Sequence, residues 1–144
     1  MAGPFNLERF VRAQADVFPQ VLAELCAGEK RSHWIWFIFP QMKGLGHSSQ
    51  SEYYGIGSLE EAAAYLRHPV LGARLRQCTL LVTQVEGRAI SRILGYPDDL
   101  KFRSSMTLFA RAAVEAGLDG TEFNDALKKY FNSEGDPLTV AMLR

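Results

Sequence analysis

Side chains able to bind a small molecule gather between Lys30 and Ser58, where the chain reads KRSHWIWFIFPQMKGLGHSSQSEYYGIGS. An aromatic run flows there into a stretch rich in Gly, Ser and His. Small-molecule pockets commonly combine apolar walls with a few polar groups in this way. The alternative is a core helix followed by a loop, with both tryptophans as core anchors. The candidate ligand-binding residues of this segment are His33, Trp34, Trp36, Gln41, Lys43, His47, Ser51 and Tyr54.

A second polar cluster lies in the sequence PDDLKFRSS. Helix capping explains one of its aspartates, but cations are mildly unfavourable in the first turns of a helix. A pair between Asp99 and Arg103 at i,i+4 offsets this by roughly a few tenths of a kcal/mol. The two cations would be favourable there if an anionic ligand bound beside them. The serines could instead be small residues that permit close helix packing. The candidate ligand-binding residues are Lys101, Arg103, Ser104 and Ser105, and we expect the two clusters to meet in space.

If the protein is an enzyme, these residue types favour a hydrolase or glycosidase. Asp98 or Asp99 would be the catalytic acid or base, and Trp34 or Tyr54 would stack against the substrate. The sequence has no HxH, HExxH or CxxC spacing, so we predict neither a metal site nor a cofactor.

The stretch 43–51 is predicted to be a loop. Gly44 and Gly46 could offer backbone N–H groups to a phosphate, with Lys43 adding charge. No GxxxxGK[ST] pattern occurs, so an ordinary helix-linking loop is the favoured interpretation.

Composition narrows the class of protein. The chain of 144 residues fits one domain, predicted to span residues 1–144. Sixteen basic and sixteen acidic side chains give a net charge of zero, which argues against a dedicated nucleic-acid binder. No apolar run approaches the roughly twenty residues needed to cross a membrane. Cys26 and Cys78 occupy apolar helical positions, and two buried free thiols favour the reducing cytoplasm.

The pattern of apolar residues, caps and breakers predicts an all-α fold of about eight helices. Asn6, Ser58, Asp98 or Asp99, Thr121 and Asp136 are the expected N-caps, with a capping box between Ser58 and Glu61. The expected helices cover 7–27 with a break near 16, then 33–39, 58–67, 69–86, 89–94, 98–116, 121–131 and 138–143.

Three segments together carry a resemblance to a known family. They are Lys30–Gly46, Ser58–Leu75 (SLEEAAAYLRHPVLGARL) and Gly95–Ala110 (GYPDDLKFRSSMTLFA). The chain resembles the small bacterial family of unknown function whose members are often labelled calpastatin. The resemblance implies an all-helical single domain and no established activity. The label itself conflicts with the chain, because calpain inhibitors of that kind are disordered and repetitive.

A looser similarity in layout, with no motif matched, points to small helical proteins of NAD and ADP-ribose metabolism, some of which cleave N-glycosidic bonds. We therefore expect an uncharacterised cytoplasmic protein that binds a small anionic or nucleotide-like ligand between His33–Gln41 and Pro97–Ser105. One alternative is a non-enzymatic interaction module whose aromatic residues are purely core. The other is an N-glycosidase or hydrolase acting on an ADP-ribose-like or nucleotide-derived substrate. The sequence leaves the oligomeric state open.

Overall fold

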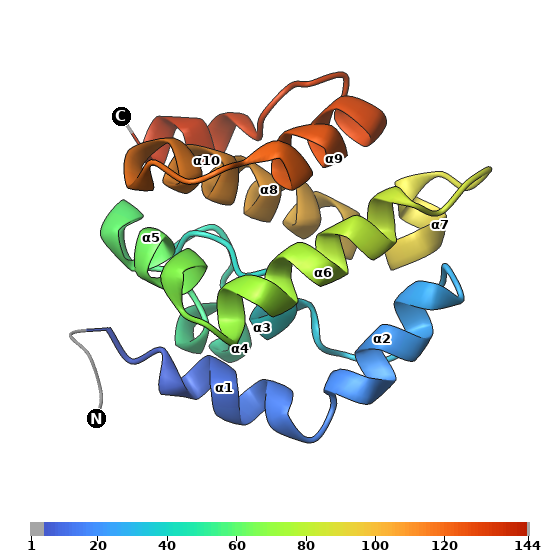
Figure 1. Ribbon diagram of the computed structural model, residues 1–144, viewed down its shortest axis with the longest axis horizontal. Coiled ribbons are helices and arrows are strands. Elements are labelled where there is room, and N and C mark those ends of the chain that lie inside the picture. The colour runs from blue at the N-terminus through green and yellow to red at the C-terminus, as the bar shows by residue number, and fades with distance from the viewer. Residues whose placement is uncertain (1–4, 144) are drawn as a thin grey trace.

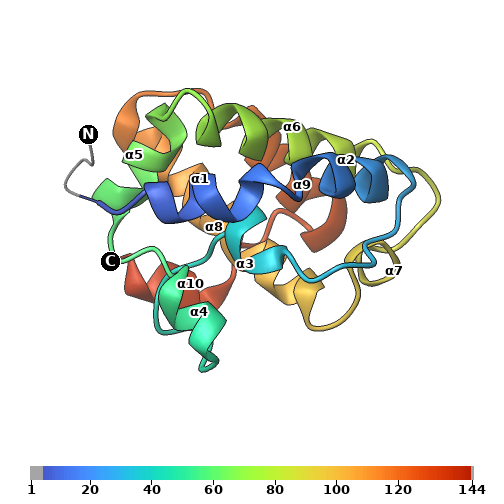
Figure 2. The same cartoon turned by 90° about the horizontal axis from the view of Figure 1, so that it is seen from below.

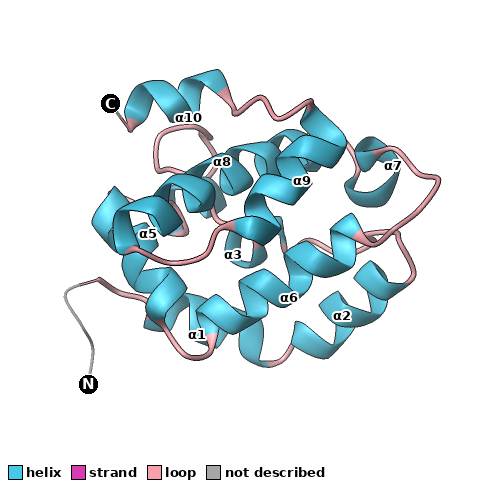
Figure 3. Cartoon of the chain, turned by 45° about the horizontal axis from the view of Figure 1, so that its top comes forward, coloured by secondary structure: helices cyan, strands magenta, loops and turns pink. Residues whose placement is uncertain are grey.

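The computed structural model describes residues 5–143, which form ten α-helices and no strand. Figure 3 shows helix throughout, joined by short loops. The helices are α1 (Glu8–Ala15), α2 (Phe18–Cys26), α3 (Ile35–Ile38), α4 (Ser49–Tyr53), α5 (Leu59–Arg67), α6 (Leu71–Thr83), α7 (Ile90–Leu94), α8 (Asp98–Ala116), α9 (Thr121–Phe131) and α10 (Pro137–Met142). The predicted all-α fold is confirmed. None of the described helices is both long and apolar enough to cross a membrane.

The long helix α8 organises the packing. It contacts α5, α9, α7 and α10, while α6 packs on α9, α5 and α2. Figure 1 shows α8, α9 and α10 along one side of the molecule and α1 and α2 along the other, with α3, α5 and α6 between them.

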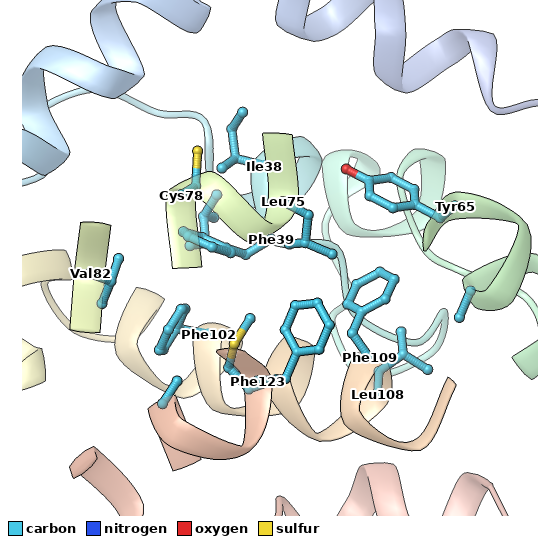
Figure 4. Close-up of a cluster of buried hydrophobic side chains, with 14 of the residues drawn as sticks. Ile38, Phe39, Tyr65, Leu75, Cys78, Val82, Phe102, Leu108, Phe109 and Phe123 are labelled. Atoms are coloured by element: carbon cyan, nitrogen blue, oxygen red, sulfur yellow. The ribbon is translucent and has the colours of Figure 1, made fainter. Parts of the chain in front are cut away.

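The core is aromatic because the predicted helix faces bring rings from several elements together. Phe39, which directly follows α3, meets Phe102 of α8 edge-on at 4.9 Å between ring centroids. Tyr65 of α5 lies 5.2 Å from the ring of Phe109. Figure 4 shows these rings in the same cluster as Cys78 of α6, which is fully buried and lies next to Phe39 in this view. Burial of such rings is the main favourable contribution to folding.

Several local predictions need correction. The stretch 43–51 is not entirely a loop, since α4 begins at Ser49, where the Ser48 side chain accepts a hydrogen bond from the Ser51 N–H at 3.1 Å. A helix of five residues is too short to show a helical period, so the sequence hid it. Cys26 is exposed rather than buried, although both thiols are free.

Some of the predicted helix N-caps are correct and others are wrong. Ser58 accepts from the Glu61 N–H at 3.1 Å as expected, but the Glu61 carboxylate accepts from the Gly57 N–H rather than that of Ser58. Asn6 and Thr121 are not N-caps, because Leu7 and Gly120 hold those positions. Neither aspartate caps α8, whose N-cap position is Pro97.

Candidate functional site

The structure brings parts of both predicted clusters together around one hollow. It lies between the loop after α3, the start of α8 and the start of α10, and its volume is about 280 Å³. α10 covers one side of α8 there (Figure 2). We call this cavity the ligand hollow. Its lining residues are Gln41, Leu45, Gly46, Pro97, Leu100, Lys101, Arg103, Ser104, Asp136 and Leu138.

Backbone pairing fixes the loop that carries Gln41. The Ile56 N–H donates to the Gln41 carbonyl at 2.9 Å, and the Lys43 N–H donates to the Ile56 carbonyl at 2.8 Å. Gly55 permits this approach, because a Cβ there would lie 2.7 Å from the Lys43 Cα. Gly46 is equally restricted, since its Cβ would lie 2.4 Å from the Ser51 hydroxyl. Ser51 therefore supports the wall of the hollow without lining it.

Gln41 brings a polar amide to the ligand hollow. It is only 9% exposed. Its side-chain amide makes no hydrogen bond with the described residues 5–143. Among residues 5–143 the fully inaccessible side-chain polar atoms without a partner belong to Trp36 and Ser105, so the Gln41 amide is open to the hollow. The amide offers donors and an acceptor to whatever enters.

Lys101 brings positive charge to the same hollow. Its ammonium lies 3.6 Å from the Asp98 carboxylate and 5.2 Å from the centre of the Trp36 ring. The half-buried Trp36 is thus covered by a cation instead of presenting an open stacking face. Its indole N–H is inaccessible and has no acceptor among the described residues.

Arg103 has a structural role besides lining the hollow. Its guanidinium donates to the carbonyls of Glu134 and Gly135, at 3.1 Å and 3.2 Å. It also lies 5.5 Å from the Phe131 ring centre. The Glu134 carboxylate lies 3.8 Å from the guanidinium, so Arg103 pairs with Glu134 and not with Asp99 as expected, and it holds the segment that leads into α10.

The predicted catalytic carboxylates stand beside the ligand hollow rather than in its lining. Asp98 binds the Lys30 ammonium at 2.7 Å, and both side chains are largely buried. Asp99 accepts from the Leu100 N–H at 2.9 Å. The carboxylate that does line the hollow is Asp136, whose Oδ2 accepts from the Thr139 N–H at 3.0 Å as the N-cap of α10.

The other candidate ligand-binding residues of the aromatic segment lie outside the ligand hollow. His33 and His47 are exposed. Lys43 faces Glu52 at 4.0 Å and lines a different hollow. Tyr54 packs on Phe37, with ring centres 5.4 Å apart.

Two of the candidate serines differ in their partners. The Ser104 hydroxyl, which lines the ligand hollow, donates to the Leu100 carbonyl at 3.1 Å. The Ser105 hydroxyl is fully buried and has no partner among residues 5–143. Within that range no group of three or more His, Cys, Asp or Glu side chains could hold a metal ion.

Sequence reasoning missed the carboxylate that fixes the start of the aromatic segment. Glu24, 4% exposed, accepts from the N–H groups of Arg31 and Ser32 at 2.7 and 3.0 Å, and from the Trp34 indole at 3.0 Å. The Ser32 hydroxyl and the Gln20 amide donate to its other oxygen. Burial by itself would raise the Glu24 pKa, but these hydrogen bonds outweigh it and lower the pKa from 4.5 to about 2. Trp34, 1% exposed, is thereby a core residue away from the hollow.

Comparison with known proteins places these features in one family. The profile described as "Protein of unknown function (DUF1810)" matches residues 4–143. The crystal structure of the conserved hypothetical protein Rv1873 from Mycobacterium tuberculosis is similar to this chain over 98% of each, with 55% sequence identity and a TM-score of 0.93. The comparison with curated proteins found no match.

Proposed function

Because the chain belongs to this DUF1810 family of unknown function, we propose a function from its own residues: the protein binds a small anionic ligand in the ligand hollow. The observation that carries the proposal is the Gln41 amide, which has no hydrogen-bond partner among the described residues and opens into the same lining as Lys101. An unpaired amide beside a cation suits a ligand that carries both a charge and a polar edge.

The walls and the volume restrict the ligand further. Leu45, Pro97, Leu100 and Leu138 supply apolar surface, so the ligand should carry an apolar or ring portion. A volume of about 280 Å³ lies just below the roughly 300–1,000 Å³ of pockets that enclose drug-sized ligands. The hollow would enclose a small organic acid or one part of a nucleotide, but not a whole dinucleotide.

The experiment is a thermal-shift screen of small carboxylates, sugar phosphates and nucleotides, followed by calorimetric titration of the best ligand. Lys101→Gln and Gln41→Leu should each weaken binding by roughly 1.5–3 kcal/mol, which is about tenfold or more. Lys43→Gln is the matched control, because it removes one charge from an exposed side chain outside the hollow. Equal loss of affinity in all three variants would refute the assignment, and so would a screen without any stabilising ligand.

A second candidate, an interaction module, is favoured by apolar exposure at the rim. Leu100 is 46% exposed and Leu138 is 66% exposed, and both border the ligand hollow. A partner that docks there should be blocked by Leu138→Glu even when the thermal-shift screen finds no stabilising small ligand. We propose no reaction, because neither Asp98 nor Asp99 lines the hollow.

We further propose a cytoplasmic location, for which the two free thiols are the support. Fractionation of the producing cell would test it.

A further inference from the structure

A larger hollow, separate from the ligand hollow, lies at the turn between α6 and α7. Its volume is about 580 Å³ and it is lined by Glu29, Gly87, Arg88, Ala89 and Arg92. The loop after α2 reaches α7 at this place, since the Lys30 N–H donates to the Ile93 carbonyl at 2.7 Å. In Figure 2 this loop runs beside α7 at the edge of the molecule. We call the hollow lined by these five residues the arginine hollow.

Positive charge exceeds negative charge around the arginine hollow. Glu29 lies 3.9 Å from Arg88 and 3.7 Å from Arg31, so one carboxylate serves two guanidinium groups. Arg92 has no carboxylate within 4.0 Å among residues 5–143. The lining holds two arginines and one glutamate, a local charge of +1 in a chain whose net charge is zero.

The arginine hollow also has hydrogen-bond donors in fixed positions. Arg88 donates to the Gly28 carbonyl at 3.1 Å, which holds its guanidinium at the edge of the hollow and leaves further N–H groups free. The backbone N–H groups of Gly87, Arg88 and Ala89 have no acceptor among the described residues. Gly87 has a φ of +74°, a conformation that favours glycine, while no atom lies within 4 Å of the position where its Cβ would be.

We infer that the arginine hollow binds a phosphoryl group of a small molecule. Guanidinium groups bind phosphate oxygens through two parallel N–H bonds, and phosphate supplies the acceptors that the turn lacks. The inference does not depend on the ligand hollow, because the two share no lining residue.

The test follows the backbone amide resonances of Gly87, Arg88 and Ala89 by NMR while pyrophosphate or inorganic phosphate is added at low ionic strength. Saturable shifts of these amides are expected in the wild type. Arg92→Gln should weaken the affinity about tenfold, the effect of losing one charged hydrogen bond. Saturation by both anions would show that one phosphoryl group suffices, and saturation by pyrophosphate alone would show that two are needed; each supports the inference.

Arg12→Gln is the matched control, since Arg12 is exposed on α1 and its removal lowers the net charge equally. It should leave pyrophosphate affinity unchanged. Arg92→Lys keeps the charge and should retain part of the affinity, even if Arg92→Gln folded poorly. No saturable amide shift, or equal loss in Arg12→Gln and Arg92→Gln, would overturn the inference.

Discussion

Glu24→Gln should destabilise the protein in a way that depends on pH. The Glu24 pKa falls from 4.5 in the unfolded chain to about 2 in the folded protein. A carboxyl with a depressed folded pKa contributes stability that is fully present above the unfolded pKa and is lost as pH falls towards the folded pKa. The shift corresponds to roughly 3 kcal/mol of unfolding free energy near neutral pH.

The same calculation gives the pH profile. By about pH 3 the contribution of the Glu24 charge should fall to roughly 1.4 kcal/mol. The stability difference between wild type and Glu24→Gln should therefore shrink by about 2 kcal/mol between pH 6 and pH 3. A constant offset remains, because a glutamine amide cannot accept hydrogen bonds with both of its ends.

Urea denaturation followed by circular dichroism at several pH values measures both quantities. Glu60→Gln, an exposed carboxylate in the first turn of α5, is the matched control and should stay within about 0.5 kcal/mol of wild type. A Glu24→Gln difference that does not change between pH 6 and pH 3 would refute the reasoning, since it would mean that the Glu24 charge is not held by its donors.

Three further outcomes are expected. Cys26 should react with a thiol reagent in the native protein, whereas Cys78, whose pKa burial raises to about 12, should react only after denaturation; a count of two native thiols would contradict this. Gly55→Ala should cost about 1–3 kcal/mol, because its Cβ would strike backbone, while Gly57→Ala, which meets only a flexible side chain, should stay within about 0.5 kcal/mol in thermal unfolding. Ser58→Ala should lower stability by about 1 kcal/mol through loss of the cap, and an unchanged melting temperature would argue against that hydrogen bond.

The helical fold was predictable because helical spacing and breakers are local signals. The faces of α6, α8 and α9 follow the apolar residues of the sequence. Glu24 illustrates what could not be predicted. Within VLAELC it resembles a solvated helix position, and its donors follow in an irregular loop with no period to read.

The candidate site was also predictable only where neighbouring residues in the sequence carry the signal. Lys101 and Gln41 were singled out because each carries polar groups beyond the needs of its local structure. Asp136 was recognised only as the cap of a terminal helix. Its place in the ligand hollow depends on where α10 packs, and no pattern near Asp136 encodes that position.

The docking of α10 has a consequence for how such a protein can diversify. α10 packs mainly on α8, and its Leu138, Val140 and Met142 remain partly in solvent. The wall it contributes can therefore change in shape and polarity without disturbing the aromatic core. Arg103 holds the preceding backbone through carbonyl groups, so this contact does not depend on the side chains of α10 itself. Relatives could thus acquire new ligand preferences by drift in this one short helix while they keep the same scaffold.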